Sequence, residues 1–384
     1  MMNSVYKLLF EFLRRAAGVE ANANYALVNI SADEWLKIFE EAKRQSVFDV
    51  VSRLPKEELP PKPLLMSWIA HAEANRDMNV RINKEAARMT EVFSKEGRRT
   101  AVLKGAANAR LYPNPFSRQC GDIDLWVEGG RKSIEKLLLD LNLPPEHDDS
   151  ACWHHIHLPA NEDGIVVEVH YKPAFGIPFR NGKFQKYLNN EIVNAELVPE
   201  GFYVPSIKFA LVMQLSHLQQ HFYNKGIGLR QYMDYFILLQ HSSESDRKEV
   251  AAVMKSLYMG KACGAVMWVL GEVFGLNREL MLCAPDEWRG KKLLKLALED
   301  GNFGRYALNR PEKSRNVFIR WFKDCAKRLH WIPFDPIDVV FFELKYWLRT
   351  LSVLPLRIKH RRITSDCLSL FFVLNVILSL VYVL

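Results

Sequence analysis

The chain has 384 residues, of which 49% are hydrophobic and 25% are charged, a balance that excludes extensive disorder and predicts a packed globular protein. Its length allows two domains, or one domain with a large helical appendage. Lysine and arginine (52 residues) exceed aspartate and glutamate (44 residues), and the resulting net charge of +8 suits a polyanionic partner without requiring one.

The six cysteines are scattered and never form a Cys-x-x-Cys motif. This spacing argues against a disulfide framework or a cysteine-based zinc site, and it favours a reducing, cytoplasmic location. The first apolar stretch, residues 5–12, contains Lys7 and Glu11 and is followed by two arginines, a pattern that does not fit a signal peptide.

Residues 1–98 are predicted to form a helical N-terminal segment. Residues 4–17 have the apolar spacing of an amphipathic helix, and the sequence from Ser31 is a capping-box signature that opens a second helix. Prolines interrupt the pattern at residues 59–63, and residues 64–94 then predict one long helix.

An α/β core is predicted for residues 99–205. It begins with a short buried strand, residues 100–103, which ends at Lys104 and Gly105, and a helical turn or two follow over residues 106–111. A glycine that opens a helix beside a lysine is a candidate seat for phosphate groups.

The centre of this core is the strand predicted over residues 121–127. Asp122 and Asp124 alternate with apolar residues there, so both carboxylates are expected on one face, and Gly121 lets a substrate approach the backbone. The alternative is an edge strand whose acids only face water. A helix that covers the sheet is predicted over residues 133–141.

A hairpin is predicted next, with strands at residues 152–158 and 165–171 and a turn at residues 161–164. Alternation along its second strand places Glu168 and His170 on one face. We expect Glu168 to meet Asp122 and Asp124, because three carboxylates on neighbouring strands form a site for a metal and a phosphate.

Three histidines in the first strand of the hairpin raise the alternative of a zinc site. Alternation predicts that His155 and His157 share one face and that His154 lies on the other, and no cysteines accompany them. We therefore interpret them as strand residues beside a polar site.

The order of these motifs resembles the nucleotidyltransferase superfamily with a polymerase-beta-like core. Within it, the similarity is greatest to the bacterial group described as uncharacterised nucleotidyltransferase family proteins. The matching pieces are Leu103-Lys104-Gly105-Ala106, Leu111-Tyr112-Pro113, Arg118, Gly121-Asp122-Ile123-Asp124-Leu125 and Val167-Glu168-Val169-His170, with a weaker match at His217, His221, Leu229-Arg230 and Asp234.

The resemblance implies an α+β fold, in which a small mixed sheet is flanked by the helical N-terminal segment and a larger helical C-terminal domain. It also implies transfer of a nucleoside monophosphate (NMP) from a nucleoside triphosphate (NTP), such as ATP, to an acceptor hydroxyl that the sequence does not identify. Asp122, Asp124 and Glu168 would be the catalytic residues and the ligands of Mg²⁺ or Mn²⁺.

The resemblance further assigns nucleotide binding to Lys104, Gly105, Arg118 and Gly121. The superfamily usually has Gly-Ser or Gly-Gly where this chain has Gly105-Ala106, so a hydroxyl that often contacts a phosphate is missing. For Arg118 the alternative is a structural ion pair with one of the two aspartates.

A helical domain is predicted for residues 206–310, with further helices at residues 247–275 and 286–300. His217 and His221 share a helix face, as do Arg230 and Asp234. The candidate contacts across the cleft are His170, His217, Arg230 and Asp234. The alternative for the last two is an intrahelical ion pair.

The C-terminal region, residues 311–384, begins with interleaved basic and aromatic residues that suit RNA or an anionic membrane surface. Residues 367–384 contain no charge and follow a basic stretch at 357–362. They are either a short membrane-spanning segment, which would leave the body of the protein cytoplasmic and membrane-associated, or a buried terminal helix.

Two other functions fit the same motifs. The first is a catalytically silent protein that binds a nucleotide or a partner on this fold. The second is a glycosyltransferase that uses Asp-x-Asp to hold a metal, but that class needs a nucleotide-binding α/β half before the motif, where this chain is mainly helical.

Overall fold

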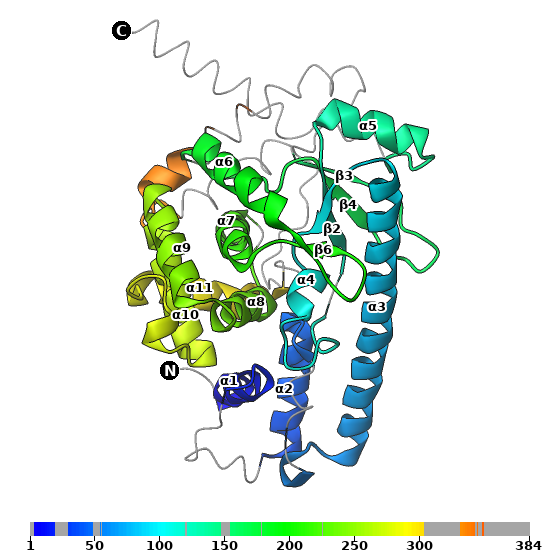
Figure 1. Ribbon diagram of the computed structural model, residues 1–384. Helices are drawn as coiled ribbons and strands as arrows, with labels where there is room; N and C mark the ends of the chain where they lie inside the picture. The colour runs from blue at the N-terminus through cyan, green and yellow to red at the C-terminus, as the bar shows by residue number, and fades with distance from the viewer. Residues whose placement is uncertain are drawn as a thin grey trace, which may run out of the picture.

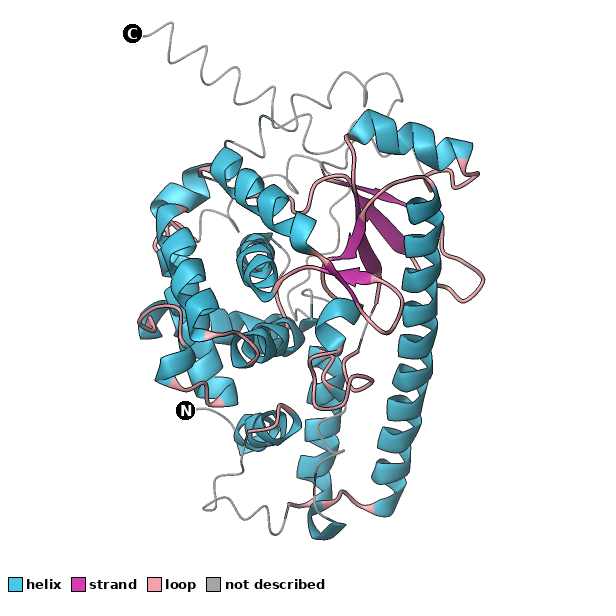
Figure 2. Cartoon of the chain, in the orientation of Figure 1, coloured by secondary structure: helices cyan, strands magenta, loops and turns pink. Residues whose placement is uncertain are grey.

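A computed structural model shows a mixed α and β protein in which a small sheet lies among many helices (Figure 1, Figure 2), and it confirms the predicted α+β class. The structure describes residues 4–19, 30–48, 54, 56–119, 121–146, 154–177, 179–224, 226–302, 331–341, 344 and 348. The basic stretch at 311–330 and the apolar segment 367–384 lie outside these residues.

Three helices precede the sheet, as predicted. Helix α1 (Ser4–Ala16) and helix α2 (Ala32–Gln45) are followed by a 3-10 turn at Lys56–Glu58 and by α3 (Lys62–Lys95). The capping box at the start of α2 is present, because Ser31 and Glu34 each accept a hydrogen bond from the backbone of the other. Helix α3 has 34 residues and runs along one side of the molecule (Figure 1).

The main sheet has four strands in the order β1-β2-β4-β3. They are β1 (Thr100–Val102), β2 (Ile123–Val127), β3 (His155–His157) and β4 (Val167–His170). Strand β1 is antiparallel to β2, β2 is parallel to β4, and β4 is antiparallel to β3, which confirms the predicted hairpin. A second, two-stranded sheet pairs β5 (Glu196–Leu197) with β6 (Tyr203–Val204).

One face of the main sheet is apolar. Leu125 of β2 and Val169 of β4 are fully buried there, in a core shared with α3 and with α5 (Arg131–Asp140), the helix predicted to cover the sheet. Because side chains alternate along a strand, the residues between these apolar ones face the opposite side. That opposite face carries Asp124, Glu168 and His170.

The helices after the sheet build a second core, which also takes in α1 and α2. They are α6 (Asn181–Glu191), α7 (Ile207–Asn224), α8 (Leu229–Gln240), α9 (Glu244–Ser256), α10 (Gly260–Phe274) and α11 (Glu287–Asp300), with 3-10 turns at Ile192–Asn194 and Arg278–Leu280. The helical stretch predicted over 247–275 is divided, because Tyr258 has φ of +62°, a left-handed conformation that ends α9.

Within the described residues, none of the helices combines the length and the apolar character needed to cross a lipid bilayer. The candidate membrane segment at 367–384 is not among those residues.

Candidate active site

The polar face of the main sheet is built by the register of three strands. Asp124 of β2 lies opposite Glu168 of β4, and on the other side of β4 His157 lies opposite Glu168 and His155 opposite His170. Five side chains that bind protons or metals therefore project from one small patch of sheet, which faces away from α3.

Asp124 is the buried centre of this patch, with its side chain only 3% exposed. One of its oxygens, Oδ1, lies 3.1 Å from Nζ of Lys104 and 3.1 Å from Nε2 of His170. Burial alone would raise the pKa of the Asp124 carboxyl, but Lys104 and His170 outweigh that effect and lower it. Asp124 is therefore an anion that the protein neutralises with its own cations.

Lys104 lies two residues after the last residue of β1 and connects the sheet to helix α7. Its Nζ lies 3.3 Å from Nε2 of His217, and Nε2 of His221 lies 3.0 Å from the same His217 atom. Burial opposes the charge on Lys104, but Asp124, Asp122 and Glu168 together raise the pKa of its ammonium. Burial, Lys104 and His221 lower the pKa of His217, so its neutral ring accepts a hydrogen bond from Lys104.

Glu168 is surrounded by imidazole rings. Its Oε2 lies 3.4 Å from Nε2 of His170 and 3.4 Å from Nδ1 of His155, and its Oε1 lies 3.5 Å from Nδ1 of His157. Burial lowers the pKa of His170, but hydrogen bonds to Asp124 and Glu168 outweigh that effect and raise it. Burial and His170 lower the pKa of His155 to about 4.

The expected position of His154 is wrong. His154 precedes β3, so strand alternation does not apply to it, and its Nε2 lies 3.1 Å from Nδ1 of His155. Burial, followed by His170 and His155, lowers the pKa of His154 well below its usual value. His154 therefore belongs to the same group of rings as His155 and His170.

The residues that could hold a divalent metal differ in part from the predicted set. One ligand atom each from Asp124, Glu168 and His170 lies within 4.8 Å of the others, so these three residues form a suitable donor set. Among the described residues, no such group includes Asp122. Asp122 is exposed and precedes β2, and its negative charge helps to raise the pKa of Lys104.

The predicted phosphate seat is short. Helix α4 (Ala106–Ala109) is a single turn, so it has little dipole to offer an anion. Gly105 has φ of +63°, a conformation that favours glycine, and a Cβ there would lie 3.6 Å from the backbone oxygen of Asp122. Gly121 is exposed, and a Cβ there would meet nothing within 4 Å.

Arg118, Arg230 and Asp234 form a second cluster. Nε of Arg118 donates to Oδ1 of Asp234 at 2.7 Å, and Nη2 donates to Oδ2 at 2.7 Å. The hydroxyl of Tyr112 also donates to Asp234, and Nη1 of Arg230 donates to the backbone oxygen of Gln119. The structural ion pair considered for Arg118 exists, but its partner is Asp234 and neither of the two predicted aspartates.

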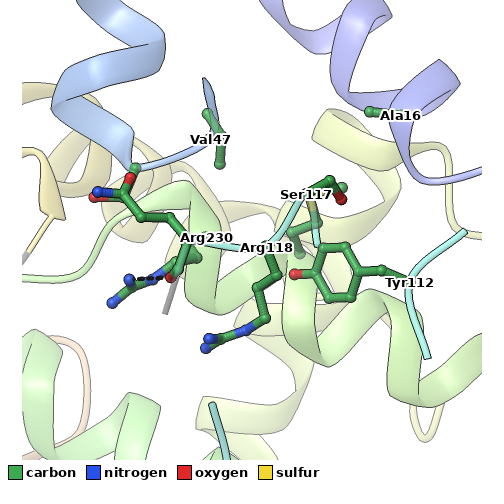
Figure 3. A pocket seen from close by; sticks show the side chains of 9 residues that line it. Ala16, Val47, Tyr112, Ser117, Arg118 and Arg230 are labelled. Carbon is green, nitrogen blue, oxygen red and sulfur yellow. Dashed lines mark hydrogen bonds between the residues drawn. The ribbon is translucent and has the colours of Figure 1, made fainter. Parts of the chain in front are cut away.

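Arg118 and Arg230 line a small pocket with Tyr112 (Figure 3). Residues near the ends of α1 and α2 complete its wall, including Ala16 and Val47. None of the metal-binding candidates lines this pocket, so the nucleotide-binding role of Arg118 and the cleft roles of Arg230 and Asp234 stay predictions.

The pairing of His157 with Glu168 follows from the length of the turn between the two strands. Counting outward from a four-residue turn at 161–164 pairs His157 with Glu168 and His155 with His170, and this is the observed register. The contact between Lys104 and Asp124 has no such local signal, because helix α4 and a stretch without regular structure separate β1 from β2.

Comparison with known proteins gives one match. The family model described as Uncharacterised nucleotidyltransferase matches residues 31–275, which run from the start of α2 to the end of α10. No curated protein and no solved structure matches the chain.

Proposed function

The chain belongs to the uncharacterised nucleotidyltransferase family, and we propose that it is a metal-dependent enzyme that moves an NMP from an NTP to a hydroxyl acceptor and releases pyrophosphate. The observation that carries this proposal is the pairing of Asp124 with Glu168 on adjacent parallel strands, next to Lys104. Two carboxylates and a cation at one point are the groups that phosphoryl chemistry needs.

The donor set fits a divalent metal, because Asp124 and Glu168 supply hard oxygen ligands and His170 is compatible with Mn²⁺ as well. A bound Mg²⁺ or Mn²⁺ would neutralise the triphosphate and stabilise the negative charge on the oxygens of the reacting phosphate. Asp122, exposed beside Lys104, is the predicted further ligand from the rim of the site.

Lys104 supports the binding of an anionic substrate. Its raised pKa keeps the ammonium charged, and His217 holds it at the junction of the sheet and α7. A phosphate that binds beside Asp124 would therefore lie near the fixed positive charge of Lys104, which also forms an ion pair with Asp124. The missing hydroxyl at Ala106 leaves this contact to Lys104.

Glu168 is the group best placed to take a proton from the acceptor. Its side chain is 15% exposed, whereas those of Asp124 and His170 are 3% and 5% exposed. Of the two paired carboxylates, Glu168 is therefore the more accessible to an acceptor hydroxyl, and a carboxylate within hydrogen-bond reach of that hydroxyl serves as a general base. Positioning and electrostatics would supply most of the acceleration.

The direct test is label transfer from NTPs that carry the label on the α-phosphate, with Mg²⁺ or Mn²⁺ and a cell lysate as the source of acceptors. We expect a labelled product with the wild-type chain, none with Asp124→Asn, and an unchanged yield with Asp163→Asn. Asp163 is a matched control, because its side chain is 53% exposed in the hairpin turn. Full transfer by Asp124→Asn would overturn the assignment.

One observation favours the alternative of a silent nucleotide-binding protein. Lys104 already neutralises Asp124, and the usual serine is absent after Gly105. In that case NTPs would bind with an affinity that depends on Lys104, and no label would move to any acceptor. The same assay, combined with calorimetric titration of NTP, distinguishes the two functions.

A further inference from the structure

The edge of the main sheet holds a second group of possible ligands, made by β3 and one carboxylate of β4. One ligand atom each from His155, His157 and Glu168 lies within 4.8 Å of the others. We propose that these three residues form a second metal site, which takes a divalent ion of the zinc class in preference to Mg²⁺.

The three residues lie close enough together to share one small ion. Zinc–nitrogen bonds of 2.0–2.1 Å place tetrahedral ligands about 3.3 Å apart. The Nε2 atoms of His155 and His157 lie 3.0 Å apart, while it is their Nδ1 atoms that lie 3.4 and 3.5 Å from the oxygens of Glu168. One ligand atom of each residue lies within 4.8 Å of the others, so rotation of the side chains would let the three share one ion.

The type of donor sets the choice of ion. Imidazole nitrogen is a good ligand for Zn²⁺, Co²⁺ and Ni²⁺, whereas Mg²⁺ requires near-octahedral oxygen ligands and keeps much of its water. Two imidazoles with one carboxylate therefore select against Mg²⁺. The neighbouring group of Asp124, Glu168 and His170 has two carboxylates and one imidazole, so adjacent sites would differ in preference.

The site has an opening to solvent. The side chain of His157 is 38% exposed, while those of His155 and Glu168 are 12% and 15% exposed. An ion can therefore enter past His157 and then lie partly shielded from water. Three protein ligands leave a fourth position for water or for an anionic oxygen of a substrate, as in zinc sites of catalytic type.

The surrounding rings support ligation by His155. Nε2 of His154 lies 3.1 Å from Nδ1 of His155, so this contact can fix the orientation of the His155 ring. Nδ1 of His154 and Nδ1 of His170 are buried and have no hydrogen-bond partner among the described residues. The rings beside the proposed site thus carry buried nitrogens that the described residues leave without a partner.

The second site shares one ligand, Glu168, with the donor set of the proposed function. An ion held by His155 and His157 would fix the carboxylate of Glu168 and thereby set its orientation toward Asp124. Binding of that ion needs neither an NTP nor transfer activity, so the two proposals are testable separately.

The test uses the full chain without an affinity tag, stripped of metal with a chelator, and Co²⁺ as the probe. We expect one Co²⁺ per chain with the intense visible absorption of low-coordinate cobalt, displaced by Zn²⁺ and not by a large excess of Mg²⁺. His155→Ala and His157→Ala should each weaken binding at least tenfold, on the order of 1.4 kcal/mol. His241→Ala, an exposed histidine at the end of α8, is the control and should bind as the wild type does.

Asp124→Asn separates the two proposals, because it should keep the cobalt spectrum and lose label transfer. The inference is overturned if His155→Ala and His157→Ala bind Co²⁺ as tightly as the wild type, if only Asp124→Asn abolishes binding, or if Mg²⁺ displaces Co²⁺ readily. His157→Gln tests the same ligand at the exposed edge with less change in volume, and circular dichroism of each variant verifies its folding.

Discussion

The guanidinium of Arg118 and the carboxylate of Asp234 form a two-point ion pair with side chains only 6% and 4% exposed. The pair joins the loop before β2 to helix α8, across 116 positions of sequence. Tyr112 donates its hydroxyl to the same carboxylate at 2.7 Å. These contacts fix the loop that leads into the strand of Asp124.

We expect Asp234→Ala to lower the free energy of unfolding by about 3–5 kcal/mol, because it leaves the buried guanidinium of Arg118 without its counter-charge. Urea unfolding followed by circular dichroism measures the loss. The double variant Arg118→Met/Asp234→Leu should recover part of it, since both charges are then gone. As a control, Arg88→Ala removes a more exposed pair with Glu85 and should cost at most about 1 kcal/mol. Equal losses from Asp234→Ala and Arg88→Ala would contradict the structural role given to Asp234.

Lys104→Met should destabilise the metal-free protein by on the order of 3 kcal/mol, because Asp124 loses the ammonium that lies 3.1 Å away. A divalent cation can replace that charge, so Mn²⁺ should raise the melting temperature of Lys104→Met more than that of the wild type. Differential scanning calorimetry with a chelator, and then with Mn²⁺, measures both effects. An equal increase in the two proteins would show that Lys104 and the ion do not serve the same carboxylate.

Asp338 makes folding stability depend on pH. Burial, followed by Asp335, raises the pKa of the Asp338 carboxyl from 3.8 to about 7, against the opposing effects of Lys261 and the hydrogen bond from Gln219. At a pH between these two pKa values, Asp338 keeps its proton in the folded protein and has released it in the unfolded chain. The contribution to stability is therefore present below the unfolded pKa and is lost as the pH rises through about 7.

Asp338→Asn should accordingly be more stable than the wild type at about pH 8, by up to about 4 kcal/mol, and nearly equal to it at about pH 4. Urea titrations at both pH values measure the difference. Asp77→Asn removes an exposed carboxylate from α3 and should show no such trend. A constant difference between Asp338→Asn and the wild type would mean that the carboxyl does not titrate in this window.

Gly290 marks a close contact between α10 and α11. A Cβ at this position would lie 2.5 Å from a ring carbon of Trp268, so Gly290→Ala should lower the free energy of unfolding by about 1–3 kcal/mol. Gly260 opens α10 with nothing within 4 Å of a Cβ, and Gly260→Ala should be neutral or slightly stabilising. Thermal unfolding of the two variants tests the packing, and a loss confined to Gly260→Ala would contradict it.

Much of the fold follows from local patterns in the sequence. The helix after Ser31, the long helix after the prolines and the hairpin of β3 and β4 each depend on spacing within a few residues, and all three are present. The alternation that places Asp124 and Glu168 on the polar face is local in the same sense. Patterns of this kind predict which face of the sheet a side chain occupies, once the first and last residues of the strand are known.

The structure differs from the expectations drawn from the sequence at two kinds of place. One is the end of a strand, where the alternation of side chains stops, and the other is a contact between residues far apart in the sequence. Strand β2 begins at Ile123, so alternation does not bring Asp122 into the buried group, and β3 begins at His155, so it does not carry His154 to the other face. The partner of Arg118 lies on a helix much later in the sequence, and no periodicity identifies it. The division into four segments and the roles of the site residues stay predictions.

The strands of the main sheet connect the apolar core on one face to the candidate metal ligands on the other. Each strand that presents a candidate ligand alternates it with a side chain held in the apolar core, as Asp124 alternates with Leu125 and Glu168 with Val169. A change of shape in the core beneath the sheet would therefore tilt the strands and shift the ligands above it. Mutations that only alter side-chain volume in that core should therefore change the proposed metal preference without replacing a single ligand.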